Sequence, residues 1–89
     1  MITTKKDFIL RKFGNEYMVV PVGTAGKEFS GIIRMNETGA FFWKELTAGT
    51  TEDALVQAAM AHYDGLDQET AQKDVHRFLE TIAMALETC

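Results

Sequence analysis

The side chains best suited to metal or nucleophilic chemistry in this 89-residue chain are two histidines and one cysteine. His62 and His76 have no second histidine or cysteine three or four residues away, the spacing by which one helix presents two metal ligands. Cys89 has no candidate base near it in the sequence, so a thiol nucleophile is not expected. A single cysteine also excludes a disulfide framework. These residues therefore predict neither a metal centre nor covalent chemistry.

Residues 23–27 read Gly-Thr-Ala-Gly-Lys, which invites comparison with a phosphate-binding loop. The segment lacks the GxxxxGK(S/T) spacing and precedes an expected strand instead of a helix, so we interpret it as a turn. No acid–base pair, nucleophile arrangement or serine motif of a phosphopantetheine carrier is visible. We therefore expect a protein that is not an enzyme and that uses no cofactor.

Charge and length restrict the classes of function further. Nine Lys and Arg against thirteen Asp and Glu give a net charge of −4, which argues against holding nucleic acid or an anionic membrane through bulk charge. Residues 1–35 carry six basic and three acidic side chains, whereas residues 36–89 carry three and ten. A chain of this length, 46% hydrophobic and without a repeat or linker, fits one domain over residues 1–89. Because no signal peptide or membrane-spanning run is visible, a cytoplasmic location is expected.

The first 35 residues have the pattern of a small antiparallel sheet. Apolar-rich runs at residues 8–13 and 17–22 are separated by Gly14-Asn15, a pair that suits the positive φ of a tight hairpin turn. A third run covers residues 29–35, where alternation places Ile33 and Met35 on one face and Arg34 on the other. We therefore predict three strands.

From Asn36 the apolar period becomes helical, and three helices are expected. Asn36 caps the first, which ends at Ala48-Gly49. Thr50, three residues before Asp53, resembles the start of a capping box for the second helix, which ends near residues 64–65. Asp67 caps a third and longer helix with an apolar stripe formed by Ala71, Val75, Phe78, Leu79, Ile82 and Leu86. Three strands followed by three helices predict an α+β fold.

Three segments in this order resemble the PqqD-like family. Residues 32–43 read Ile-Ile-Arg-Met-Asn-Glu-Thr-Gly-Ala-Phe-Phe-Trp, and residues 49–56 read Gly-Thr-Thr-Glu-Asp-Ala-Leu-Val. The third segment, residues 74–79, reads Asp-Val-His-Arg-Phe-Leu. Each motif is short, but their order and spacing are fairly specific, and the resemblance covers roughly residues 6–86.

The resemblance implies a winged-helix-like module, also called a RiPP recognition element. Such a module binds the leader segment of a ribosomally made precursor peptide and presents it to a modifying enzyme, often a radical SAM protein, without catalysis of its own. The leader is expected to add as a strand along the third strand, with side chains entering the cleft between that strand and the third helix. The expected peptide contacts are Phe29, Ile32, Ile33, Arg34 and Met35 on the strand, and Val75, Arg77, Phe78 and Leu79 on the helix.

The physical chemistry of these segments is compatible with that expectation. An edge strand offers unpaired N–H and C=O groups to an extended peptide, and pockets for alternate side chains then supply specificity. Arg34 and Arg77 are suited to pairing with acidic groups of the peptide. Val75, Phe78 and Leu79 at helical spacing are, however, also what a plain core requires.

Two further questions stay open from the sequence. A winged-helix DNA-binding regulator is the alternative function, although Lys73, His76 and Arg77 lie among Glu69, Asp74 and Glu80, a poor charge pattern for a phosphate-lined groove. An exposed strand edge also allows a homodimer by strand exchange. The product of the pathway, pyrroloquinoline quinone or another modified peptide, is not fixed by these residues.

Overall fold

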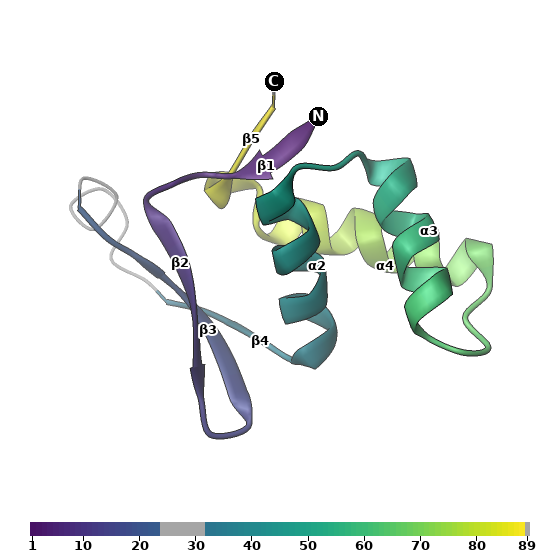
Figure 1. Ribbon diagram of the computed structural model, residues 1–89, viewed down its shortest axis with the longest axis horizontal. Coiled ribbons are helices and arrows are strands. Elements are labelled where there is room, and N and C mark those ends of the chain that lie inside the picture. The colour runs from purple at the N-terminus through teal and green to yellow at the C-terminus, as the bar shows by residue number, and fades with distance from the viewer. Residues whose placement is uncertain (24–31, 89) are drawn as a thin grey trace.

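A hairpin of two six-residue strands opens the main sheet of the computed structural model, which describes residues 1–23 and 32–88 (Figure 1). Strand β2 (Phe8–Phe13) pairs antiparallel with β3 (Glu16–Pro21) around Gly14-Asn15, as predicted. Gly14 has φ 60°, the left-handed value that a two-residue hairpin turn with glycine first requires.

The turn fixes which pairs along this ladder are hydrogen-bonded. Phe13 and Glu16 flank a two-residue turn and form a hydrogen-bonded pair, and such pairs alternate with non-bonded ones along antiparallel strands. The amide of Val22 donates to the carbonyl of Asp7 at 2.8 Å, as this alternation requires. Met18 therefore belongs to a bonded pair and directs its N–H and C=O toward β2.

The third strand of the sheet, β4 (Ile33–Met35), pairs antiparallel with β3, so the strand order is β2-β3-β4. The strand was predicted over residues 29–35, and its first three residues, including Phe29, lie outside the described residues. The predicted sheet of three antiparallel strands is confirmed.

Three helices follow, each with a side-chain cap. The Asn36 side chain accepts a hydrogen bond from the Gly39 amide (2.9 Å) at the start of α2 (Glu37–Ala48). Asp67 accepts one from the Thr70 amide (2.7 Å) at the start of α4 (Gln68–Thr81). Both caps were predicted.

The cap of α3 (Glu52–His62) differs from the prediction by one residue. Thr51, not Thr50, accepts the bond from the Ala54 amide, at 3.1 Å. The backbone of Thr50 is used elsewhere, because its N–H and C=O bond with the C=O and N–H of Ile2, at 3.0 and 2.6 Å. The N-terminal segment thereby fixes the connection between α2 and α3.

A short second sheet was not predicted. Strand β1 (Ile2–Thr4) pairs antiparallel with β5 (Leu86–Thr88), which follows a 3₁₀ turn at Ala83–Ala85. The expectation that Leu86 extends the apolar stripe of the third helix is therefore wrong, because α4 ends at Thr81 and Leu86 lies in β5. Pairing with β1 covers the end of the chain that follows α4.

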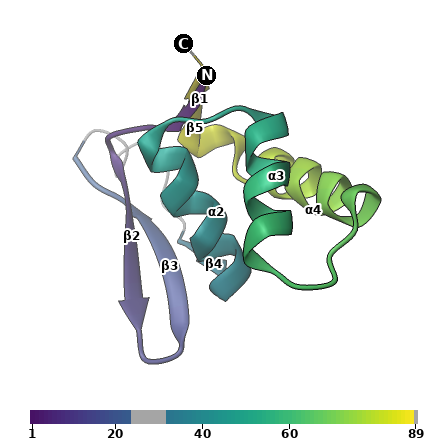
Figure 2. The same cartoon turned by 45° about the vertical axis from the view of Figure 1, so that its right-hand side comes forward.

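The helices pack on one face of the β2-β3-β4 sheet (Figures 1 and 2). The sheet contributes Phe8 and Val19 to the buried core, and the helices contribute most of the rest. The largest fully buried side chains are Leu46, Leu55, Ile82, Val19 and Val75. The α+β fold class is confirmed.

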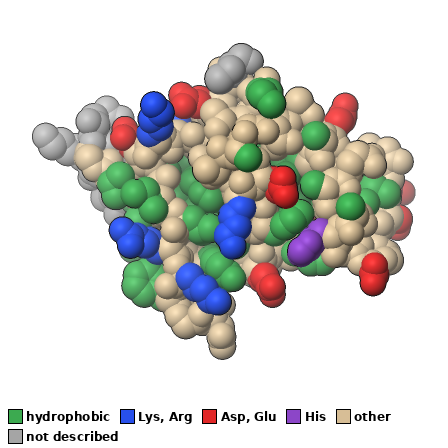
Figure 3. All heavy atoms as spheres, viewed as in Figure 1, with side chains coloured by type: hydrophobic (Ala, Val, Ile, Leu, Met, Phe, Trp, Pro, Cys, Tyr) green, Lys and Arg blue, Asp and Glu red, His purple; other side chains and the backbone are tan. Residues whose placement is uncertain are grey.

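Basic side chains are confined to one part of the surface. On the face shown in Figure 3 the Lys and Arg side chains gather over the strands and α2, whereas acidic side chains are spread across the whole face. None of the helices in residues 1–23 and 32–88 is long and apolar enough to cross a membrane.

Candidate functional site

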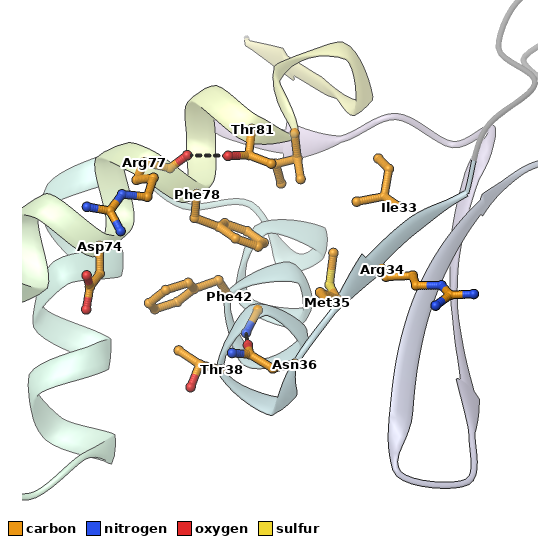
Figure 4. A pocket seen from close by; sticks show the side chains of 12 residues that line it. Ile33, Arg34, Met35, Asn36, Thr38, Phe42, Asp74, Arg77, Phe78 and Thr81 are labelled. Atoms are coloured by element: carbon orange, nitrogen blue, oxygen red, sulfur yellow. Dashed lines mark hydrogen bonds between the residues drawn. The ribbon is translucent and has the colours of Figure 1, made fainter.

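A groove of about 470 Å³ lies between β4 and α4, with the start of α2 as its floor (Figure 4). We call it the β4–α4 groove. Its lining residues are Ile33, Arg34, Met35, Asn36, Thr38, Gly39, Phe42, Asp74, Arg77, Phe78, Thr81 and Ile82. The structure therefore brings the predicted strand and the predicted helix face together across one cleft.

The strand wall of the groove follows the alternation predicted for β4. Ile33 and Met35 are partly buried and pack against the core, whereas Arg34 is exposed. In Figure 4 the Arg34 side chain points away from the other labelled side chains. Arg34 therefore borders the groove with its backbone, and its guanidinium is not directed into the cleft.

The open edge of β4 carries the backbone groups of Arg34. Because Met18 directs its N–H and C=O toward β2, the pair of Met18 with Arg34 is a non-hydrogen-bonded one. Arg34 thus turns its N–H and C=O away from β3, and no strand in the described part of the chain pairs with that edge. Ile32 directly precedes β4, and continuing the alternation by one residue gives its N–H and C=O the same direction. These groups form a template for an added extended strand.

The helix wall consists of side chains one turn apart on α4. Asp74, Arg77, Phe78 and Thr81 follow the spacing that places residues on one helix face. The ring of Phe78 packs against that of Phe42, with centroids 5.3 Å apart. Aromatic surface therefore separates the groove from the core beneath it.

The two other predicted helix contacts do not line this groove. Val75 is fully buried and belongs to the core. Leu79 is partly buried and packs against the same core. Val75 thus supports the wall from behind and has no surface to offer a peptide in this conformation.

Glycine at position 39 lets strand, helix and floor approach closely. A Cβ on Gly39 would lie 2.9 Å from the Cβ of Met35 and 3.2 Å from Cε1 of Phe78. The cap by Asn36 was predicted from the sequence and is confirmed, but the packing role of Gly39 was not predicted. A glycine one turn into an otherwise good helix was the available signal.

Two opposite charges lie on the helix wall. Asp74 and Arg77 both line the groove, and neither forms an ion pair within residues 1–23 and 32–88. Asp74 was not among the predicted contacts. The groove therefore combines an apolar floor with one acidic and one basic side chain that are not paired with each other or with another charged side chain in the described residues.

His76 does not line the groove, and its imidazole contacts two carboxylates. Its Nε2 lies 2.6 Å from Glu80 and its Nδ1 3.3 Å from Glu52 on α3. The hydrogen bond with Glu52 and the charge of Glu80 raise the pKa of His76 above its ordinary value near 6.5. In the described part of the chain, no three His, Cys, Asp or Glu side chains are grouped as a metal site would require.

A second hollow of about 600 Å³ lies between β2 and α2, and its lining includes Lys5, Lys6 and Lys44. It is the larger of the two hollows in volume. Strand β2, which borders it, is the other edge strand of the main sheet, so an open edge alone does not separate the two hollows. The β4–α4 groove is the better candidate because it joins the strand and the helix face that the family resemblance indicates.

Comparisons with known proteins agree with this architecture. The solved structure "TbiB1 in Complex with the TbiA(beta) Leader Peptide" matches with a TM-score of 0.76 and 20% sequence identity, over 98% of this chain and 96% of that one. At that identity the likeness is one of fold. No curated protein sequence matches the chain. The family model described as coenzyme PQQ synthesis protein D (PqqD) matches residues 16–85, which is most of the chain. The protein therefore belongs to the PqqD family.

Proposed function

We propose that residues 1–89 act as one peptide-binding domain of the RiPP recognition element type, which binds the leader segment of a ribosomally made precursor peptide and performs no catalysis. Family membership supports this function, and so does the neighbour of similar fold, whose solved structure holds a leader peptide. The alternative, a DNA-binding regulator, is not favoured by either comparison.

The observation that carries the proposal is the open edge of β4 beside an apolar groove. An added strand would bond to the outward N–H and C=O of Arg34 and Ile32, which supply affinity independent of sequence. Alternate side chains of that strand would enter the groove toward Phe78, Met35 and Ile33. Backbone pairing and side-chain pockets thus lie on one side of one strand.

Charged groups would add specificity at the helix wall. Arg77 is free to pair with an acid of the peptide, and Asp74 is free to pair with a base one turn away. Leu79 and Phe29 stay predicted contacts at the ends of the site, and Phe29 lies outside the described residues. The peptide that fits best is therefore an amphipathic one with alternating apolar residues.

The bound leader would be handed to a separate modifying enzyme, for which a radical SAM protein is the proposed class, in the cytoplasm. A domain of this size that holds a peptide along one edge leaves the peptide's following residues free for that enzyme. A homodimer by strand exchange at the same edge would compete with the peptide.

The test compares Arg34→Pro with Arg34→Ala, using the precursor peptide encoded beside this gene. Both variants remove the guanidinium, but only proline removes the outward N–H, and an edge strand tolerates proline where the N–H is not used in the sheet. A lost hydrogen bond of about 1 kcal/mol predicts that Arg34→Pro binds roughly fivefold more weakly than Arg34→Ala in calorimetric titration. Equal affinities of two folded variants would show that the peptide does not pair with this edge.

A further inference from the structure

The face of the β2-β3-β4 sheet opposite the helices is uncovered, although it is rich in apolar side chains. Ile9 and Phe13 of β2 are 38% and 57% exposed, and Ile32, beside β4, is 57% exposed. Phe8 and Val19, on the other face of the same strands, are buried in the core. We call the uncovered side the outer sheet face; by alternation it comprises Ile9, Arg11, Phe13, Glu16, Met18, Val20, Ile32 and Arg34.

Two arginines stand in the middle row of this face. The register places Arg11 opposite Met18, and Met18 opposite Arg34, so that the three side chains form one row on the same face. Both arginines are exposed, and neither has an ion pair within residues 1–23 and 32–88. Glu16, at the turn end, is the one acidic side chain among these eight residues, and Asp7 directly precedes β2 in the same alternation. Figure 3 shows hydrophobic and basic side chains interleaved over β2.

We infer that the outer sheet face is a docking surface for a second protein that presents carboxylates around an apolar centre. Several exposed large apolar side chains on one face mark an interaction surface, because a monomer gains nothing by exposing them together. Arginine is enriched in such interfaces and pairs with carboxylates in a two-point geometry. The outer sheet face combines both features.

The charge of the outer sheet face favours one of three kinds of binding partner. A second copy docked face to face would bring the arginine rows of both copies together, and like charges in contact are repulsive. An anionic membrane would meet a chain whose net charge is −4. A partner surface with local carboxylates meets neither obstacle.

The position of the face beside the groove indicates which protein docks there, and this step rests on the proposed function. Strand β4 belongs to both sites: the backbone of Arg34 lies on the open edge, and its side chain stands on the outer sheet face. A protein docked on this face would lie next to a peptide bound along β4. The partner that fits is therefore the enzyme that modifies the bound peptide.

Two neighbouring residues on opposite faces of β2 provide a matched test. Arg11→Glu reverses a charge on the outer sheet face, and Lys12→Glu makes the same change in charge on the other face of the strand. Neither residue lines the β4–α4 groove. Affinities of both variants are measured for the purified modifying enzyme encoded beside this gene, and separately for the leader peptide alone.

The inference predicts that Arg11→Glu weakens enzyme binding about tenfold or more, that Lys12→Glu changes it by less than about twofold, and that both bind the leader peptide normally. Absence of enzyme binding by the unaltered protein, or equal effects of the two variants, would overturn it. The inference would also be overturned if the unaltered protein bound phosphatidylglycerol vesicles, or self-associated in sedimentation, and only Arg11→Glu abolished that binding or self-association. If the unaltered protein did not bind the leader peptide, the proposed function would be refuted instead. The affinities for the enzyme would still decide whether the outer sheet face is a docking surface.

Discussion

Replacing Gly39 by alanine tests whether close packing shapes the β4–α4 groove. The added Cβ would lie 2.9 Å from the Cβ of Met35, about half an ångström short of the 3.4 Å at which ordinary contact begins. A second contact, 3.2 Å from a ring carbon of Phe78, is also tight. The Cβ of Met35 is fixed to the backbone of β4, so the strand itself must move.

Two effects of opposite sign then decide the stability of Gly39→Ala. Alanine is favoured over glycine within a helix by about 0.8–1 kcal/mol. Overpacking a close contact with one methyl group costs about 1–3 kcal/mol. Because the nearest atom cannot rotate away, we expect the packing cost to exceed the propensity gain, with a net loss of about 1 kcal/mol in the free energy of unfolding.

Urea unfolding measures this change, and titration with the leader peptide measures its effect on the groove. We expect weaker peptide binding as well, because both displaced side chains, Met35 and Phe78, line the cleft. Glu37→Ala is the matched control, since it changes an exposed residue in the same turn of α2 that does not line the groove, without adding an atom. If Gly39→Ala were instead more stable by about 1 kcal/mol and bound the peptide normally, the packing argument would be refuted.

Three further changes have defined outcomes. Asn36→Ala removes the cap of α2 and should lower the free energy of unfolding by about 1 kcal/mol in urea titration. Leu55→Ala creates a cavity in the core and should cost about 2–5 kcal/mol by the same assay, with the peptide affinity of the folded fraction unchanged. Because the pKa of His76 is raised by Glu52 and Glu80, its contribution to stability is present below about pH 6.5 and lost as the pH rises through the folded-state pKa. The stability difference between the unaltered protein and His76→Gln should therefore shrink between about pH 5.5 and pH 8 in thermal unfolding.

Local signals in the sequence were sufficient for most of the fold. The hairpin followed from a glycine beside an asparagine between two apolar runs, and two helix starts followed from Asn36 and Asp67. Each of these depends on residues close together in the chain. The β1–β5 sheet could not be predicted in the same way, because three-residue strands are too short to show alternation and their pairing joins the two ends of the chain.

The site was predicted in outline but not in detail. The pairing of one strand with one helix face followed from the family resemblance, and Ile33, Met35, Arg77 and Phe78 do line the groove. Val75 was predicted to contact the peptide but is buried in the core, because an apolar stripe along a helix does not show where the core ends and the cleft begins. That boundary depends on how α4 is rotated against the elements it packs on, chiefly α3, which is a property of the folded packing.

The direct test of strand addition is a scan of the leader peptide in which each amide nitrogen is methylated in turn. An added strand directs every second N–H toward β4, so we predict that alternate positions lose affinity about fivefold or more in calorimetric titration, while the positions between them bind nearly normally. Arg34→Pro removes a different bond, the one that the Arg34 N–H donates to a peptide carbonyl, and should leave this alternation in place because proline keeps its C=O acceptor. Losses that follow no period of two, or no losses at all, would contradict the account.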